Sequence, residues 1–259
     1  SSLEHIEEDY DENYLERFNI GFQQLMTSTA MHKSEIIDHE DSSQKMIERI
    51  DSCPASEGLA LKGLVKTGFI DIDFKSGGLP KRSLIYLAGL TSMGKTIISQ
   101  QMAINIALTG KPVVYYSLEM NEEEFMKRFV GIRGDLITRT MTIGPMNTIY
   151  RNKAKDALNE TKNIPFYKIF DTSSISSMYS HIQKIQTKER SDVGAVFIDR
   201  FEFIDERREK GESEFSWTSR LSKKLVKLSR TIEAPLVCLV QLSRDCVKRG
   251  KTGNHRPRL

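Results

Sequence analysis

The residues with the clearest chemical capacity lie in one stretch, 89–96, which matches the G-x-x-x-x-G-K-T pattern of a phosphate-binding loop. Its glycines let backbone N–H groups converge on an anion. Lys95 supplies a compact charge to the β- and γ-phosphates, and the Thr96 hydroxyl can bind Mg²⁺. We therefore expect a nucleoside triphosphate site formed by Gly89, Ser92, Met93, Gly94, Lys95 and Thr96.

The segments on either side of this loop are those that a phosphate-binding loop requires. Residues 83–88 form an apolar run that predicts a buried strand. Residues 97–108 predict a helix that ends before Gly110 and Pro112, and the start of this helix near Lys95 adds the positive end of its dipole. A chance loop that merely contains glycines is the alternative, and the flanking strand and helix argue against it.

Length and composition are those of a globular domain. The 259 residues are 39% hydrophobic and 28% charged, which is enough apolar material for a sizeable core. Cys53, Cys238 and Cys246 are odd in number and lack C-x-x-C spacing, so we expect neither a disulfide framework nor a zinc site. With no secretory signal and no apolar run near the roughly 18 residues of a membrane span, we expect a cytoplasmic protein.

Charge is unevenly distributed along the chain, although its net value is only +3. Residues 1–60 carry 14 acidic and 4 basic side chains, a net charge of −10, so the rest of the chain carries +13. An acidic leader followed by a basic body suggests two functional regions, of which the basic one could face nucleic acid. Ordinary surface charge is the alternative, because +13 over that length is moderate.

Residues 1–65 are expected to form an acidic helical leader or linker. Apolar side chains recur at three- and four-residue steps between residues 12 and 31, which predicts an amphipathic helix. A second helix is predicted after Ser42 or Ser43, and residues 53–58 end it. The leader is too short to bury its own core, so its apolar stripes must pack on the body or on another subunit. The stripe of the second helix consists of Met46, Ile47 and Ile50.

Three further polar residues stand at the ends of predicted strands. Glu119 follows a strand over residues 112–117, Asp199 ends another over 194–199, and Gln241 follows a third. The carboxyl ends of parallel strands share one sheet edge, where ligands bind in open α/β folds. A buried strand that ends in an acidic residue is the pattern of the carboxylate that holds Mg²⁺ beside a phosphate loop. By itself, Glu119 fits a solvated cap better than a catalytic group.

The order of these motifs resembles the ATPase domain of DnaB-family replicative DNA helicases, including phage-type relatives. The resemblance covers residues 66–259 and implies a RecA-like α/β fold with a mainly parallel sheet flanked by helices. It also implies ATP and Mg²⁺ as ligands and a ring-shaped homo-oligomer, expected to be a hexamer. The motifs that carry it are T-G-F at 67–69, G-G-L at 77–79, S-M-G-K-T at 92–96, S-L-E-M at 117–120, the strand ending in Asp199, and Q-L-S-R at 241–244.

The resemblance further implies residue roles and partners. It makes Glu119 the base that activates the attacking water, beside Lys95 on the phosphates. It makes Gln241 a sensor between the γ-phosphate and bound DNA. The basic tail, residues 244–258, would follow the backbone of single-stranded DNA, although a basic end without a partner is the alternative. Primase and a helicase loader are the further partners that it suggests.

The sequence departs from the family in two places. Arg200 and Glu202 stand where members continue with Tyr-Leu-Gln, so neither inherits a role. No segment matches the family's arginine finger, which acts across the subunit boundary, so residues 66–259 are expected to be a motor domain that lacks its C-terminal end. Since such a finger is worth about 10³–10⁵ in turnover, we expect slow hydrolysis by this chain alone.

Residues 131–232 predict several helices, a strand and a loop. Residues 131–165 read as polar and helical with a break at 144–145, and they precede a strand over 166–170 and a helix over 173–188. Residues 205–214 lack apolar side chains and predict a mobile loop. A core-facing helix follows, with a basic face that is either solvated or in contact with phosphate or a second subunit. Its apolar residues are Trp217, Leu221, Leu225, Leu228 and Ile232.

Together these features predict an ATP-driven replicative DNA helicase motor that translocates on single-stranded DNA. The first alternative is a RecA/RadA-type recombination ATPase, which binds single strands as a filament. The second is a nucleotide-gated DNA-binding or loading module with little turnover. Ring particles would favour the helicase and open filaments the recombination ATPase, while ATP hydrolysis stimulated by single-stranded DNA would count against the loading module.

Overall fold

The computed structural model describes residues 38–51, 64–142 and 146–242. The helix predicted over 12–31, the helix end at 53–58, the break at 144–145 and the basic tail at 244–258 lie outside the described residues. The chain divides between Leu59 and Ala60 into two units.

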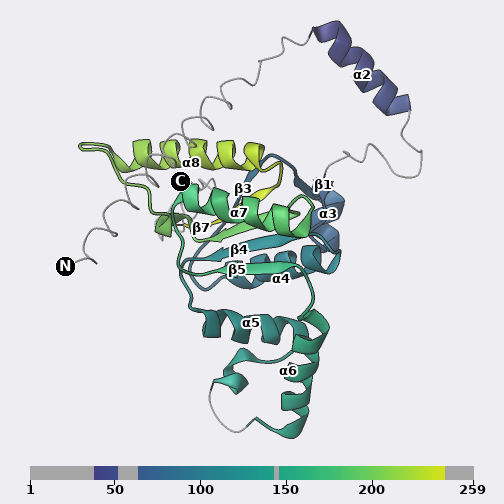
Figure 1. The fold of residues 1–259 in the computed structure, drawn as a ribbon, viewed down its shortest axis with the longest axis vertical. Helices are drawn as coiled ribbons and strands as arrows, with labels where there is room; N and C mark the ends of the chain where they lie inside the picture. Colours follow the sequence, from purple (N-terminus) through teal and green to yellow (C-terminus); the bar gives the residue numbers. More distant parts are fainter. Residues whose placement is uncertain (1–37, 52–63, 143–145, 243–259) are drawn as a thin grey trace, which may run out of the picture. The chain divides into compact units, whose positions relative to one another are not determined.

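In the described part of the second unit, five parallel strands form the central sheet, in the order β3-β7-β6-β4-β5 (Figure 1). Such a sheet requires a crossover between each pair of consecutive strands, and helices supply these crossovers. The predicted α/β fold class is therefore confirmed. The strands are β3 Leu84–Gly89, β4 Val113–Ser117, β5 Phe166–Ile169, β6 Ala195–Asp199 and β7 Leu236–Gln241.

The helices follow the strands in the predicted order. The helices predicted over 97–108, 173–188 and 217–232 are all present, while the stretch between β4 and β5 resolves into two helices and a short 3₁₀ turn. Ahead of β3, a short helix separates two antiparallel strands, β1 and β2. The bounds are β1 Leu64–Val65, α3 Ile70–Ser76, β2 Leu79–Pro80, α4 Lys95–Leu108, α5 Glu122–Gly134, η1 Thr138–Met141, α6 Thr148–Thr161, α7 Ile175–Glu189, η2 Phe201–Phe203 and α8 Glu214–Thr231.

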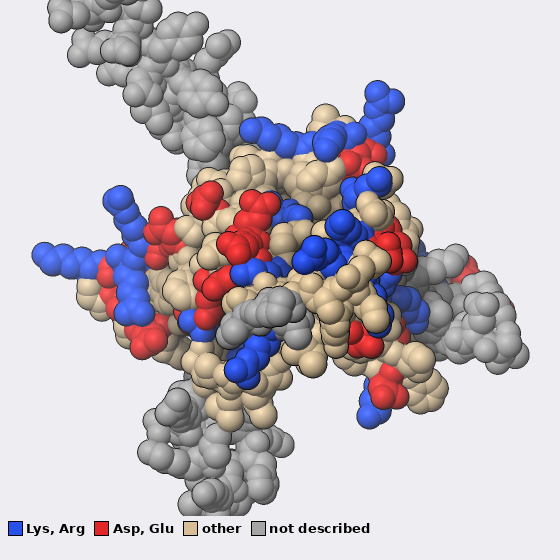
Figure 2. Space-filling model, turned by 90° about the horizontal axis from the view of Figure 1, so that it is seen from below, with Lys and Arg blue, Asp and Glu red and all other residues tan. Residues whose placement is uncertain are grey.

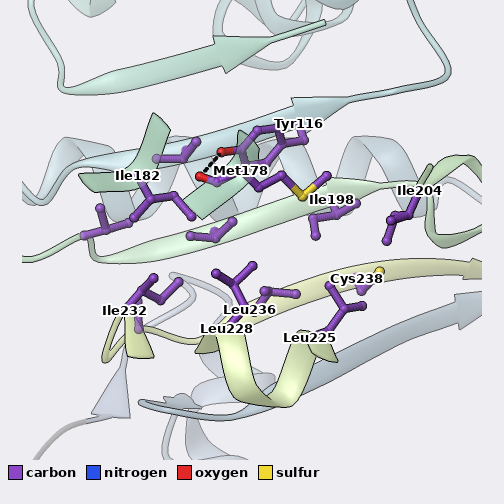
Figure 3. Packing of buried hydrophobic residues seen from close by; sticks show 14 of the residues in the cluster. Tyr116, Met178, Ile182, Ile198, Ile204, Leu225, Leu228, Ile232, Leu236 and Cys238 are labelled. Carbon is purple, nitrogen blue, oxygen red and sulfur yellow. Dashed lines mark hydrogen bonds between the residues drawn. The ribbon is translucent and has the colours of Figure 1, made fainter. Parts of the chain in front are cut away.

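Helices cover the sheet on both faces (Figure 1). On one face, Ile182 of α7 and Leu225 of α8 pack in one cluster with Ile198 of β6, and all three are fully buried (Figure 3). The Tyr116 hydroxyl, buried in the same cluster, donates a hydrogen bond to the carbonyl of Met178 at 2.9 Å. The tyrosine can therefore lie in the core without an unpaired polar atom.

The opposite face of the sheet packs against α4 and α5. Ile104 of α4 and Phe125 of α5 are fully buried there. Tyr115 of β4 stacks on Phe197 of β6 with ring centroids 5.7 Å apart, and it meets Phe125 edge-on at 5.0 Å. Because β4 and β6 are fully buried on both faces, they read as continuous apolar runs in the sequence.

The strand before the phosphate loop is less buried than predicted. We expected a buried strand over 83–88, but β3 is half-buried for most of its length, and Ala88 is exposed. The reason is topological: within the described part of the chain, β3 lies at the edge of the sheet and pairs only with β7. An apolar run identifies a strand, but it does not tell a central position from an edge.

The first unit contributes one described element, α2, His39–Asp51. It starts a few residues before the predicted start after Ser42 or Ser43, and Glu40 and Asp41 in its first turn suit the positive end of the helix dipole. Met46, Ile47 and Ile50 are exposed by between 47% and 50%. Which surface their stripe packs on stays a prediction.

The charged stretch before α8 is irregular, as predicted, but it is attached to that helix. Arg220 donates to Glu212 at 2.7 Å, and Lys224 donates to Glu206 at 2.6 Å. The Trp217 indole N–H also donates to the carbonyl of Glu206 at 2.8 Å. Two basic residues of the α8 face that the sequence predicts to be solvated or in contact with a partner are thus paired within the chain.

Among the described residues, no helix combines the length and the apolar character needed to cross a membrane. On the face shown in Figure 2, Lys and Arg side chains lie interspersed with Asp and Glu. That face therefore resembles ordinary surface charge more than a nucleic-acid footprint.

Candidate active site

An open pocket of ≈ 680 Å³ brings the predicted chemical residues together. Its lining includes loop residues 91–96 and the three strand-end residues Glu119, Asp199 and Gln241. Strand register explains this convergence, because Ser117, two residues before Glu119, pairs with Asp199. The expectation that these side chains share one sheet edge is confirmed.

The phosphate loop runs from the end of β3 at Gly89 to the start of α4 at Lys95. Gly94 is the N-cap of α4 and has a φ of 82°, in the left-handed region that glycine adopts at least cost. Gly89 is the one predicted loop residue that does not line the pocket. It instead pairs with Gln241 across β3 and β7, which anchors the loop beside that side chain.

Lys95 points back over its own loop. Its Nζ donates to the carbonyl oxygens of Gly89 at 2.7 Å and Leu90 at 2.9 Å. An ammonium has three donors, so one N–H remains for a phosphate oxygen, and a closer phosphate would compete for the others. The Lys95 side chain is therefore already held beside the loop whose bound phosphates it is expected to contact.

Asp199 and Thr96, the two predicted metal ligands, are in contact. Asp199 is only 2% exposed, and burial raises the pKa of its carboxyl group, while a hydrogen bond from the Thr96 hydroxyl opposes that rise. The Tyr115 hydroxyl donates to Asp199 Oδ2 at 3.3 Å and lies 2.7 Å from Ser99 Oγ. A buried carboxylate whose neighbours are hydroxyl groups fits a hard cation, which would balance its charge.

This pair is a partial coordination set. Within residues 38–51, 64–142 and 146–242, no three His, Cys, Asp or Glu side chains gather into a metal-binding group. Mg²⁺ at nucleotide sites commonly takes one or two protein oxygens and completes its shell with phosphate oxygens and water. One carboxylate and one hydroxyl thus suit Mg²⁺ bound together with a nucleotide.

Glu119 lies just beyond the end of β4, and its backbone is tied to the neighbouring strand. The N–H of Leu118 donates to the carbonyl of Asp199 at 2.7 Å, and Ser117 Oγ donates to the carbonyl of Met120 at 3.1 Å. The Glu119 side chain is 44% exposed, so water can reach its carboxylate. A water-accessible carboxylate in the phosphate pocket has the placement that a general base needs.

Gln241 is the last residue of β7, and its amide contacts two other pocket residues. Its Nε2 donates to Thr91 Oγ1 in the phosphate loop at 2.9 Å, and its Oε1 accepts a hydrogen bond from Arg200. Its backbone N–H donates to Glu202 Oε1 at 2.9 Å. Residues 243 and 244 of its motif lie outside the described residues, so any coupling of Gln241 to DNA stays a prediction.

Sequence reasoning missed two basic residues in this pocket. Arg200 lines it and lies with its Nε 3.6 Å from Glu119 Oε2. Arg128 of α5 lines it as well and lies close enough to lower the pKa of Asp199, against the larger effect of burial. Arg128 stands four residues after Glu124, another lining residue, so helical spacing could have indicated it.

The sequence matches known proteins over most of its length. Residues 64–259 match the family described as DnaB-like helicase C terminal domain. A "Replicative DNA helicase DnaB" of Synechocystis is 33% identical over 183 residues, which cover 70% of this chain and 20% of the relative. One from Geobacillus stearothermophilus is 28% identical over 186 residues, covering 71% and 41%. The chain thus spans less than half the length of these relatives.

Solved structures share the fold. A DnaB-like replicative helicase, described with its interactions with primase, superposes with a TM-score of 0.72 at 23% identity, over 96% of this chain and 58% of that one. A second solved structure, described as an ATPase domain, gives a TM-score of 0.70 at 24% identity, over 86% and 76%. These likenesses support the predicted RecA-like form of the parallel sheet.

Proposed function

The chain belongs to the family of DnaB-like helicase C-terminal domains, and from this premise we propose that it is the ATP-driven motor of a replicative DNA helicase. In this proposal it hydrolyses ATP with Mg²⁺ and translocates on single-stranded DNA as a ring-shaped homo-oligomer, a hexamer, in the cytoplasm. Residues 66–259 are the motor domain and residues 1–65 its helical leader. Primase and a helicase loader are its expected partners.

One observation carries the proposal: a phosphate loop, a buried carboxylate, an accessible carboxylate and a neutral amide line one pocket. A phosphate loop alone indicates only nucleotide binding. Asp199 and Glu119 add a metal ligand and a base at adjacent strand ends. The amide of Gln241 adds a group that already contacts the loop. This combination suits coupled hydrolysis better than simple binding.

In the proposed reaction, each residue acts at a stated group. Lys95 holds the β- and γ-phosphates, and Thr96 and Asp199 would hold Mg²⁺, which supplies charge neutralisation on the phosphate oxygens when bound. Glu119 orients the attacking water and accepts its proton. Gln241 links the state of the phosphate loop to the segment that follows β7. Each cycle would then offset the stacking cost of about 1.4 kcal/mol per base-pair step.

The test is ATP hydrolysis with and without single-stranded DNA. We expect DNA to stimulate turnover, and we expect Glu119→Gln to lower it by about 10²–10⁴-fold, the usual worth of a general base. Glu123→Gln is the matched control, because Glu123 is an exposed glutamate in the first turn of α5 whose partner is Lys127, at 2.6 Å. Normal turnover in Glu119→Gln would show that Glu119 is not the general base.

Assembly is tested separately, by particle mass with and without ATP. A closed ring of six chains supports the motor, and micrographs that show open filaments favour a recombination ATPase instead. DNA binding that depends on nucleotide but shows no turnover favours a loading module. The basic segment 244–258 should make DNA binding salt-sensitive in each of these cases.

A further inference from the structure

Arg200 lies between the two groups that the proposed function assigns to catalysis and sensing. Its Nε is 3.6 Å from Glu119 Oε2, and one of its terminal nitrogens donates a hydrogen bond to Gln241 Oε1. Its side chain is only 20% exposed. A planar guanidinium can contact two partners at fixed angles, which an ammonium cannot do.

The Arg200 guanidinium also contacts two other side chains, those of Phe203 and Glu202. Its carbon lies 4.7 Å from the centre of the Phe203 ring, and its Nε is 3.5 Å from Glu202 Oε2. That buried Nε makes no hydrogen bond within the described part of the chain. The two carboxylates therefore interact with this nitrogen by charge attraction and not through a hydrogen bond.

These contacts extend to the phosphate loop. Gln241 Nε2 donates to Thr91 Oγ1 at 2.9 Å, so one line of polar contacts joins Thr91, Gln241, Arg200 and Glu119. Each link joins two different elements, because the four residues belong to the loop, β7, the segment after β6 and the segment after β4. A movement of Thr91 can therefore alter the position of the Glu119 carboxylate through these polar contacts, without a change in core packing.

We propose that Arg200 is a positioning residue, which holds the Glu119 carboxylate in place and links it through Gln241 to Thr91 of the phosphate loop. This inference rests on the proposed function. A general base must keep its orientation toward water, and a carboxylate that is 44% exposed would otherwise sample several rotamers. Contact with the Arg200 guanidinium restricts the Glu119 side chain to fewer rotamers.

The kinetic test compares Arg200→Gln, Arg200→Lys and a control. Arg82→Gln is the control, because Arg82 also lies 3.6 Å from a glutamate, Glu233, but at an exposed position outside the pocket. We expect Arg200→Gln to lower kcat roughly 10- to 100-fold, less than loss of the base itself, with KM and the Kd for ADP within about twofold of wild type. Arg200→Lys should retain part of kcat, and Arg82→Gln all of it.

A double variant separates positioning from an independent role. Once Glu119→Gln has removed the base, Arg200 has nothing left to position, so Glu119→Gln/Arg200→Gln should turn over like Glu119→Gln alone. Multiplicative losses in the double variant would overturn the proposal. So would wild-type kcat in Arg200→Gln, or a loss of affinity for ADP equal to the loss in kcat, which would indicate a general structural role.

A second readout does not depend on turnover. Trp217 is the single tryptophan of the chain, and its ring lies 6.2 Å from that of Phe201, the residue after Arg200. We expect the non-hydrolysable triphosphate AMP-PNP with Mg²⁺ to shift Trp217 emission in wild type and in Arg82→Gln, but not in Arg200→Gln. An unchanged wild-type emission, or an equal shift in Arg200→Gln, would contradict the link.

The outcomes also separate this inference from the function on which it rests. If Glu119→Gln keeps wild-type turnover, the assigned base is wrong and the proposed function fails with it. If Glu119→Gln loses turnover while Arg200→Gln matches Arg82→Gln, the function stands and only the role of Arg200 is refuted.

Discussion

The Tyr115 hydroxyl lies 3.3 Å from Oδ2 of Asp199, and it joins the aromatic core of β4 to the candidate metal ligand at the end of β6. Both side chains are buried. Burial is the largest cause of the raised pKa of both groups. The hydrogen bond between them raises the pKa of Tyr115 further, and it opposes the rise in the pKa of Asp199. This hydrogen bond therefore connects a packed core residue, Tyr115, to the candidate metal ligand Asp199.

Tyr115→Phe should affect both stability and Mg²⁺ use. Loss of the hydroxyl removes a buried hydrogen bond, which costs about 1 kcal/mol of unfolding free energy. Groups that orient a metal ligand are typically worth about 10–100-fold in metal affinity, so half-maximal ATP binding should need about tenfold more Mg²⁺. Urea unfolding and a Mg²⁺ titration measure the two effects.

Tyr86→Phe is the matched control for that variant. The Tyr86 hydroxyl lies 2.7 Å from Ser222 Oγ, and neither residue lines the candidate active-site pocket. We expect a comparable loss of stability and an unchanged Mg²⁺ requirement. A shift in Mg²⁺ requirement common to both variants would mean that Tyr115 acts through general stability.

Asp199→Asn should stabilise the protein while lowering the proposed ATP hydrolysis. Because burial raises the pKa of Asp199, the folded state binds this proton more tightly than the unfolded chain does. The unfolding free energy contributed by this group therefore falls as pH rises from the ordinary Asp pKa, about 3.9, through the raised value. Without nucleotide at pH 7, Asp199→Asn should be more stable than wild type.

The measurement is denaturant unfolding at pH 7 and below pH 4, together with ATP hydrolysis. The stability difference should disappear at the lower pH, where Asp199 is protonated in both states. Turnover should fall by more than about 100-fold, because a bound metal ion supplies several kcal/mol. Asp156→Asn on the exposed face of α6 is the control. A less stable Asp199→Asn at pH 7 would refute the predicted sign.

Glu212→Gln should lower stability at neutral pH and not in strong acid. Hydrogen bonds from Arg220 are the main cause that lowers the pKa of Glu212 to about 2. A depressed pKa means that the stabilisation is fully present above the ordinary value of 4.5 and is lost as pH falls toward 2. Thermal unfolding should show a lower Tm for the variant at pH 7 and equal values near pH 2.

Two further conditions check that prediction. High salt should reduce the difference at pH 7, since it screens a pair near the surface. Asp192→Asn, which changes an exposed carboxylate after α7, should leave the pH dependence as it is. Equal Tm values for Glu212→Gln and wild type at pH 7 would show that the loop does not depend on this pair.

Leu225→Ala should be strongly destabilising. Leu225 is fully buried between α8 and the sheet, and truncation of such a leucine costs about 2–5 kcal/mol through lost burial and the remaining cavity. Phe215→Ala on the same helix removes a larger side chain that is 81% exposed, and it should change the unfolding free energy by less than about 0.5 kcal/mol. Urea unfolding midpoints rank the two variants.

Several elements could be predicted because their signals are local. The glycine and lysine pattern of the phosphate loop requires a preceding strand and a following helix, and β3 and α4 supply them. The spacing of Leu221, Leu225 and Leu228 requires a helix with one buried face, and α8 has it. The apolar runs of β4 and β6 follow from burial on both faces.

Other features depend on partners distant in sequence. The position of β3 at the edge of the described sheet follows from strand order, which an apolar run does not encode. The place of Arg200 beside Glu119 depends on the pairing of β4 with β6, two strands that lie far apart along the chain. The attachment of the charged loop to α8 required the fold of that segment, because its composition alone suggested mobility.

The sequence by itself determined which groups could meet a triphosphate, since residue types and their order relative to each strand are properties of the chain. Only the tertiary structure decided which of these groups touch one another. Contacts such as those of Arg200 and Gln241 arise from strand register and from rotamers chosen in a packed environment, and both are set by long-range packing that no single segment contains.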